Sequence, residues 1–185
     1  MAFAHKFRLQ VAESRLRKKS LSVIRIKDTY NLVDAREIGL IFNATDPARI
    51  EEVKNFVHSL QVKNTHVFVI GYVNEKNISD INLLRSGFNF FSLENLSWFY
   101  KPDIPFIEDF LNRKFNILFD LDLENSYPLR YIATLSNAGM KVGKYFDGCE
   151  YLDFMIKLEP NISMQYLIEQ SVYYLNMLRK PAVNL

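Results

Sequence analysis

The feature that most constrains the fold is the pattern of residues 115–143, which reads as a strand, a polar loop, a helix and a second strand. Phe115–Leu123 is almost continuously apolar, which is typical of a strand covered on both faces, as in a parallel sheet. A helix from about Tyr127 to Ala138, ended by Gly139, and a strand at Met140–Gly143 follow. These segments form a β-α-β unit, for which a right-handed crossover is expected.

Similar segments lie on either side of this unit. Apolar runs predict further strands at Arg36–Asn43, His66–Val73, Phe88–Phe91 and, at an edge of the sheet, Tyr151–Ile156. Helical spacing predicts helices after Asp46-Pro47, near Ser79–Arg85, at Asp103–Asn112 and at Ser163–Arg179. The predicted fold class is therefore α/β: a Rossmann-like three-layer α/β/α arrangement with a mostly parallel sheet of about five to six strands and a basic N-terminal helical extension.

The length and composition of the chain indicate one large core. With 185 residues, of which 49% are hydrophobic, we expect a single α/β domain at residues 31–185 preceded by an extension at 1–30. The one cysteine, Cys149, excludes an internal disulfide and fits a reducing compartment. No apolar run approaches the roughly 18 residues of a membrane span, and no signal-peptide pattern is present, so a cytoplasmic protein is predicted.

The charges are distributed unevenly along the chain. Residues 1–27 carry eight basic side chains and one acid, whereas the rest of the chain carries five more acids than bases. One interpretation is a solvated helix that partly packs on the body. The other is an electrostatic arm for RNA, the ribosome or an acidic protein. The candidate anion-binding residues of such an arm are Lys6, Arg8, Arg15, Arg17, Lys18 and Lys19.

Two aromatic groups are candidate partner surfaces. Trp98, Phe99 and Tyr100 lie in a segment interrupted by prolines, so they either join the core or form a loop that presents aromatic rings to a partner. Tyr166 and Tyr173 form a second apolar stripe on the C-terminal helix. That stripe is either a homodimer surface or a partly buried flank of the helix.

Common catalytic patterns are missing from the sequence. The three histidines lack the spacing of metal ligands, and none of the glycine-rich dinucleotide, phosphate-loop or nucleophile-elbow motifs occurs. Cys149 lies between Asp147 and Glu150, and these acids disfavour a reactive thiolate. We therefore predict no metal and no cofactor, and the sequence leans away from an enzyme.

Short polar residues gather where two predicted strands end. Carboxylates and amides at such positions can bind a ribose, a sugar hydroxyl or Mg²⁺, but they also serve as helix caps and loop braces. The candidate ligand-binding residues are Asn43, Thr45, Asp46, Asp120, Asp122, Asn125 and Ser126. Five of them are expected to converge on one concave surface, namely Asn43, Asp46, Asp120, Asp122 and Ser126.

Several segments together resemble a known family. They are FNATD (Phe42–Asp46), VIGYV (Val69–Val73), LENLSWFYKPD (Leu93–Asp103), FDLDLENSYPLRYIATLSNAGMKVGKY (Phe119–Tyr145) and EQSVYYLNML (Glu169–Leu178). The chain looks like an uncharacterised Bacteroidota family of small cytoplasmic proteins, which implies a Rossmann-like fold and brings no established activity. Residues 115–145 are also similar to the acceptor half of heptosyltransferase-type glycosyltransferases.

Two function hypotheses follow. The first, favoured because charge asymmetry is present and catalytic motifs are missing, is a non-catalytic binding or adaptor protein whose basic arm contacts an anionic partner. The alternative is a protein that binds a sugar, nucleotide or phosphate, or an enzyme acting on one, with its site at the carboxyl ends of the parallel strands.

Overall fold

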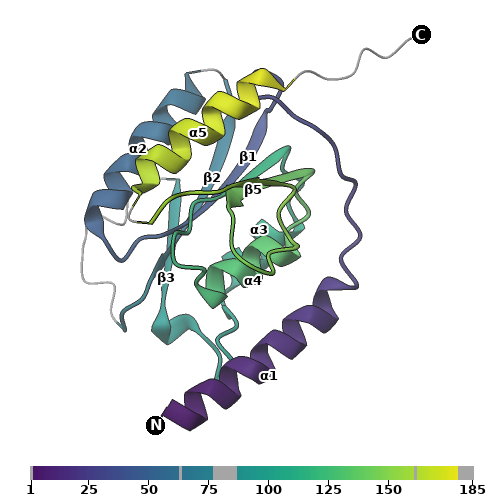
Figure 1. Cartoon of the computed structure of the whole chain (residues 1–185), viewed down its shortest axis with the longest axis vertical. Helices are drawn as coiled ribbons and strands as arrows, with labels where there is room; N and C mark the ends of the chain where they lie inside the picture. The colour runs from purple at the N-terminus through teal and green to yellow at the C-terminus, as the bar shows by residue number, and fades with distance from the viewer. Residues whose placement is uncertain (1, 63, 77–86, 161, 179–185) are drawn as a thin grey trace.

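The strands form one parallel sheet at the centre of the molecule (Figure 1). The computed structural model describes residues 2–62, 64–76, 87–160 and 162–178. Within these ranges the sheet has six strands in the order β3-β2-β1-β4-β5-β6, all parallel. The strands are β1 (Glu37–Asn43), β2 (His66–Val73), β3 (Phe88–Ser92), β4 (Ile117–Asp120), β5 (Met140–Lys144) and β6 (Phe154–Ile156). This is a Rossmann strand order, so the predicted fold class is confirmed.

The apolar run at residues 115–121 lies in the interior of the sheet, as predicted. β4, the strand it forms, is buried along its whole length between β1 and β5. Leu118 and Phe119 enter two separate cores on opposite faces of the sheet. Because both faces are covered, the strand has no polar alternation.

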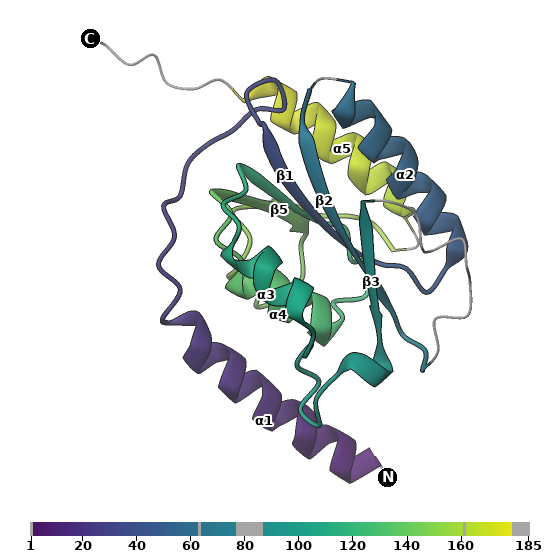
Figure 2. The same ribbon diagram turned by 180° about the vertical axis from the view of Figure 1, so that it is seen from behind.

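Helices cover both faces of the sheet (Figures 1 and 2). On one face, α2 (Pro47–Gln61) and α5 (Met164–Met177) lie side by side over a core shared with β1 and β4. On the other face, α3 (Pro105–Asn112) and α4 (Tyr127–Leu135) enclose a second core. A short 3-10 helix, η2 (Leu93–Asn95), follows β3. The arrangement is the predicted three-layer α/β/α fold.

The helix α4 ends earlier than its sequence predicts. Its last residue is Leu135, and the cap residue Ser136 is extended, with a ψ of 143°. Gly139 N donates to Phe115 O at 2.8 Å, so the backbone has already joined the sheet at this glycine. A Cβ at Gly139 would lie 2.8 Å from the ring of Tyr30. The prediction that Gly139 ends the helix is wrong. The lack of a side chain at this position instead leaves room for the ring of Tyr30.

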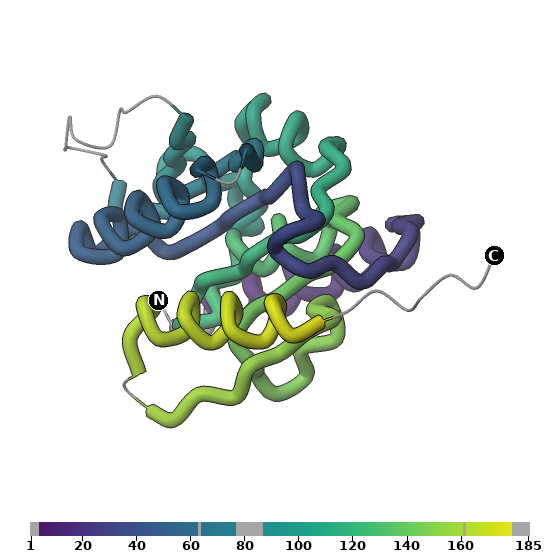
Figure 3. The backbone as a smooth tube through the Cα atoms, turned by 90° about the horizontal axis from the view of Figure 1, so that it is seen from above, coloured from purple at the N-terminus to yellow at the C-terminus, as the bar shows by residue number. Residues whose placement is uncertain are grey.

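An N-terminal helix, α1 (Ala2–Ser20), packs outside α4 as an additional layer (Figures 1 and 2). Ala12 and Leu16 are buried against the body, and Tyr127 OH donates to Ala12 O at 2.9 Å. Residues 21–36 form a strap along the outside of the molecule that leads from α1 to β1 (Figure 3). The basic N-terminal segment is therefore docked on the domain by specific contacts.

Some predicted segments fall outside the described residues. The helix predicted near Ser79–Arg85 is one of them, and the predicted end of the last helix at Arg179 is another. Among the helices that are described, none combines the length and the apolar character needed to cross a membrane.

Candidate functional site

The crossovers of the chain change sides of the sheet between β1 and β4. The chain passes from β1 to α2 on one face and from β4 to α4 on the other, and open α/β sheets commonly bind ligands where such a change occurs. Here the loop after β4 is hydrogen-bonded to α2 and to the end of β1 across the crevice. Arg49 donates to both carboxylate oxygens of Glu124 at 2.6 and 2.9 Å, and Asn43 Nδ2 donates to the same carboxylate at 3.2 Å. The usual ligand position of the fold thus holds an ion pair of the chain itself.

Asp120 and Asp122 are buried in this loop. Asp120 accepts a hydrogen bond from Tyr151 OH at 3.2 Å. Asp122 accepts hydrogen bonds from the backbone N–H groups of Glu124 and Ser126. Burial raises the pKa of Asp120 to about 7 and that of Asp122 to about 6. Because their partners belong to the chain, the two carboxylates act as braces of the loop in this structure.

The other predicted ligand residues lie on separate surfaces. Asp46 caps α2, where its Oδ1 accepts from Ala48 N at 3.0 Å, and it lines a cavity of about 490 Å³ beside the start of α5. Thr45 Oγ1 accepts from Asn74 N at 2.8 Å. Ser126 lines a different cavity on the α4 side of the sheet. The expected single concave surface is therefore not what the structure contains, since Asp46 and Ser126 line different cavities.

The aromatic segment predicted as a partner surface contacts α1. The Arg8 guanidinium carbon lies 4.7 Å from the ring centroid of Trp98 and 4.5 Å from that of Tyr100, and Arg8 Nε donates to Trp98 O at 2.7 Å. Arg15 lies 3.8 Å from the ring centroid of Phe99. Trp98 nevertheless remains 57% exposed. These contacts make residues 98–100 a docking surface for the helix within the same chain.

The basic side chains of α1 differ in their surroundings. Arg8 and Arg15 stack on aromatic rings, and Lys19 Nζ donates to Tyr131 OH at 2.9 Å. Lys6, Arg17 and Lys18, the remaining three of the predicted arm, are exposed. Of these three, Arg17 lines a cavity. Half of the predicted anion-binding residues thus pack on the body, and binding of RNA or of an acidic protein stays a prediction.

The tyrosine stripe of α5 lies on the outer side of that helix. Tyr166 is 42% exposed and Tyr173 is 57% exposed. The ring of Tyr173 contacts that of Tyr174, with the centroids 5.2 Å apart. A homodimer through this helix stays a prediction.

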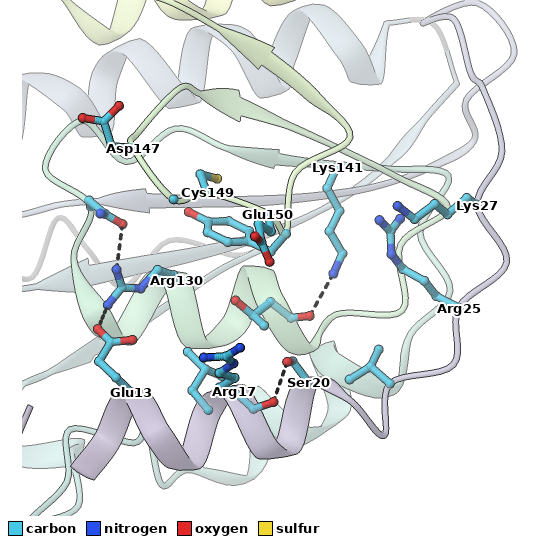
Figure 4. A pocket seen from close by; sticks show the side chains of 16 residues that line it. Glu13, Arg17, Ser20, Arg25, Lys27, Arg130, Lys141, Asp147, Cys149 and Glu150 are labelled. Atoms are coloured by element: carbon cyan, nitrogen blue, oxygen red, sulfur yellow. Dashed lines mark hydrogen bonds and ion pairs between the residues drawn. The ribbon is translucent and has the colours of Figure 1, made fainter. Parts of the chain in front are cut away.

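A cavity of about 560 Å³ lies between α1, α4, the strap and the loop from β5 to β6 (Figure 4). We call it the cationic cavity because five basic side chains line it, namely Arg17, Arg25, Lys27, Arg130 and Lys141; its acidic lining residues are Glu13, Asp147 and Glu150. Arg25 and Lys27 form ion pairs with Asp153, and Arg130 forms one with Glu13. No described carboxylate forms an ion pair with Arg17 or Lys141.

Lys141 is the most unusual group of the cationic cavity, because only 2% of it is exposed. Its side chain extends from β5 toward α4, where Nζ donates to Thr134 O at 3.0 Å (Figure 4). This is the one hydrogen bond that the ammonium group makes to the described residues, although it has three donors. Burial lowers the pKa of Lys141 to about 7; the nearby charges of Arg25 and Lys27 act in the same direction, and those of Asp153 and Asp120 oppose it.

The sequence pattern does not mark Lys141 as a site residue. It lies within a predicted strand, between Met140 and Val142, which point to the opposite face. One feature of the sequence could have identified this residue: a lysine stands within a strand that is covered on both faces. Lysines are almost never fully buried without a partner, so such a position indicates a special role. Cys149 and Tyr151 also line the cavity; Tyr151 was predicted only as the start of an edge strand, and Cys149 was considered only as a thiol.

A second cavity, of about 540 Å³, lies under the N-terminal half of α1. We call it the aromatic cavity because Tyr72, Tyr100 and Tyr127 line it, together with apolar residues (Leu9, Leu93, Pro128) and polar ones (Asn74, Asn125, Ser126). Its residues come from the segments that follow β2, β3 and β4, at the carboxyl edge of the sheet. Two predicted ligand residues, Asn125 and Ser126, are therefore at a cavity.

The described residues contain no group of three or more histidine, cysteine, aspartate or glutamate side chains placed to hold a metal ion. The histidines have other neighbours. The ring of His5 lies 5.5 Å from that of Tyr100, and His66 Nδ1 lies 3.0 Å from the Glu37 carboxylate.

Comparison with known proteins adds the family of the chain. No curated protein and no solved structure matches it. A family model does match, over residues 8–178, which covers α1 from Arg8 onward, the whole sheet and α5. The match thus extends over nearly the full length, and the chain belongs to the family of unknown function DUF6913.

Proposed function

We propose that the protein binds a small anionic ligand in the cationic cavity. The single observation that carries this proposal is Lys141, a buried ammonium group with one hydrogen bond and no ion-paired carboxylate among the described residues. A buried charge without a counter-ion is costly, and it is tolerated where function requires it. A bound anion would contact the amine directly and hold Lys141 in its charged form, which the more distant charges of Asp153 and Asp120 favour only in part.

The surroundings of Lys141 support this proposal. Arg17 enters the same cavity from α1 without an ion pair, and Arg25 and Lys27 add positive charge from the strap. Arginine and lysine donors in a partly enclosed cavity suit a phosphate or carboxylate group, because hydrogen bonds between charged partners are about twice as strong as neutral ones. The site thus resembles a binding pocket more than an open electrostatic surface.

In this proposal the basic helix α1 is part of the pocket and does not act as a free arm. Arg8, Arg15 and Lys19 are engaged by the rings of the body, so α1 acts as the roof of the two cavities. Positive charge on α1 then serves a pocket beneath the helix. Contact of Lys6 and Lys18 with a macromolecule is the competing hypothesis.

Titration with inorganic pyrophosphate tests the proposal. Arg17 and Lys18 are both exposed and adjacent, but only Arg17 lines the cationic cavity, so the two residues form a matched pair. By isothermal titration calorimetry we expect saturable one-to-one binding. Arg17→Ala should weaken binding about tenfold, which corresponds to roughly 1.4 kcal/mol, because one charged hydrogen-bond donor is lost. Lys18→Ala should leave the affinity unchanged.

Two results would contradict the proposal. One is the absence of saturable binding by the unmodified protein. The other is an equal loss of affinity in Arg17→Ala and Lys18→Ala, because that would indicate general attraction to the basic helix and favour the arm hypothesis.

A further inference from the structure

The cationic and aromatic cavities share one wall. Glu13, Asn125 and Arg130 line both of them. The guanidinium of Arg130 connects the other two residues of this wall. It forms an ion pair with Glu13, and its Nη1 donates to Asn125 Oδ1 at 3.4 Å. The third nitrogen of this guanidinium, Nε, is buried and has no hydrogen-bond partner among the described residues. The charged group at the junction of the two cavities is therefore only partly hydrogen-bonded within the chain.

The two cavities follow one another along α1. Leu9 lines the aromatic cavity and Leu16 lines the cationic cavity. At a helical rise of about 1.5 Å per residue, the two positions are about 10 Å apart along the helix axis. A phosphate or pyrophosphate ion extends over one cavity only. A nucleoside diphosphate is long enough to reach from one cavity into the other.

We infer that the two cavities together bind a nucleotide, with the base in the aromatic cavity and the phosphates in the cationic cavity. This inference rests on the proposed anion binding and names the class of ligand. The aromatic cavity has apolar walls, including Leu9, Leu93 and Tyr72, and the amide groups of Asn74 and Asn125 beside them. Apolar walls with a few convergent polar groups suit a planar ring that has hydrogen-bonding edges.

This placement also agrees with the lack of a glycine-rich phosphate loop. The position where such a loop follows β1 in dinucleotide-binding folds is bordered here by the ion pair of Arg49 and Glu124. In the inferred site the phosphates contact side chains from α1, the strap and β5. Arg17 and Lys141 are then the main cationic partners, and no backbone cradle is needed.

Calorimetric titrations with ADP, adenosine and pyrophosphate test the inference. ADP is expected to bind at least tenfold more tightly than either fragment, because it alone contacts both cavities. Leu9→Trp should fill the aromatic cavity, lower the ADP affinity to that of pyrophosphate and leave pyrophosphate binding unchanged. Gln10→Trp, at the adjacent exposed position, is the matched control and should bind all three compounds as the unmodified protein does.

A second variant covers the case in which Leu9→Trp displaces α1. Undocking of the helix would be recognised by a loss of pyrophosphate binding as well. Asn74→Ala removes an amide of the aromatic cavity that comes from the segment after β2, together with the hydrogen bond that it accepts from Tyr72 OH, without a change in α1. It should weaken ADP binding several-fold and leave pyrophosphate binding intact. Parallel titrations with GDP, CDP and UDP identify the preferred base.

The outcomes separate this inference from the proposed function. Pyrophosphate binding that depends on Arg17, combined with ADP binding that is no tighter, would overturn the inference and leave the proposed function standing. ADP affinity that is unaffected by both Leu9→Trp and Asn74→Ala would also overturn it. Failure of both ADP and pyrophosphate to bind would overturn both proposals.

Discussion

Replacement of Lys141 by methionine is expected to stabilise the fold and to abolish pyrophosphate binding. Methionine has a similar length and carries no charge, so the cost of burying the ammonium group disappears. Near neutral pH we expect the free energy of unfolding to rise by about 2–4 kcal/mol. Each unit of the pKa shift of Lys141 corresponds to about 1.4 kcal/mol of removed cost, and the lost hydrogen bond to Thr134 O offsets part of this gain. The same change removes the central cation of the proposed site.

The pH dependence of this gain follows from the direction of the pKa shift. The pKa of Lys141 is lowered from 10.5 to about 7, so between these values the unfolded chain holds a proton that the folded chain lacks. The free energy of unfolding of the unmodified protein therefore increases as the pH rises through this interval, and Lys141 destabilises the fold most below pH 7. The advantage of Lys141→Met should be largest at or below neutral pH and should shrink toward pH 10.

Urea denaturation at pH 6.5 and pH 9.5, together with calorimetry, measures both effects. Lys144→Met is the matched control, because Lys144 lies on the same strand, donates to Leu123 O and lines the cavity beside α5 instead. The control should bind pyrophosphate normally and show no stabilisation. If Lys141→Met bound pyrophosphate as tightly as the unmodified protein, the proposed site would be wrong.

Asp120→Asn is expected to stabilise the protein at high pH. The pKa of Asp120 is raised from 3.8 to about 7, so between these values the folded state holds a proton that the unfolded state has released. The unmodified protein therefore loses stability from this group as the pH rises from about 4 to 7. Asparagine resembles the protonated acid and removes this loss, which amounts to about 2–4 kcal/mol at pH 8.

The comparison with Asp122→Asn shows whether the carboxylates brace the loop. Asp122 accepts from the N–H groups of Glu124 and Ser126, and an amide offers one oxygen where the carboxylate offers two. At pH 5 Asp122 is mostly protonated in the folded protein, but its hydroxyl oxygen can still accept a hydrogen bond, whereas the NH₂ group of an amide cannot. We expect Asp122→Asn to be less stable by about 1–3 kcal/mol at this pH, because one buried N–H group is left without an acceptor. Thermal unfolding of both variants at pH 5 and pH 8 measures these differences. A gain of stability in Asp122→Asn at pH 5 would contradict the role of Asp122 as a brace.

The sheet could be predicted from the sequence because burial on both faces leaves a local signature. Phe115–Leu121 is apolar at nearly every position, and a strand of this kind can only lie inside a parallel sheet. The end of α4 could not be predicted in the same way. Gly139 fits a helix end locally, but the approach of the Tyr30 ring, more than 100 residues away in the chain, determines its role.

The candidate site was harder to predict because tertiary contacts create it. The docking of α1 depends on Arg8 at Trp98 and Arg15 at Phe99, which are contacts between distant segments that no local periodicity encodes. Asp120 and Asp122 were correctly placed at the end of a strand, but their burial in the loop follows from Tyr151 and Ser126 packing around them. The charges that line the cationic cavity come together only when α1 and the strap close over α4 and β5.

The most direct test of the central claim is an NMR titration of ¹⁵N-labelled protein with ADP. The proposed site predicts saturable shifts of backbone amide signals at the cationic cavity, namely those of Leu16, Arg17, Lys141, Gly148 and Cys149, and of Asn125, which lines both cavities. The signals of Asp46, Arg49 and Ser163, at the cavity beside α5, should stay in place. Shifts confined to that cavity or to the exposed residues Lys6 and Lys18, or the absence of any saturable shift, would contradict a ligand site beneath α1.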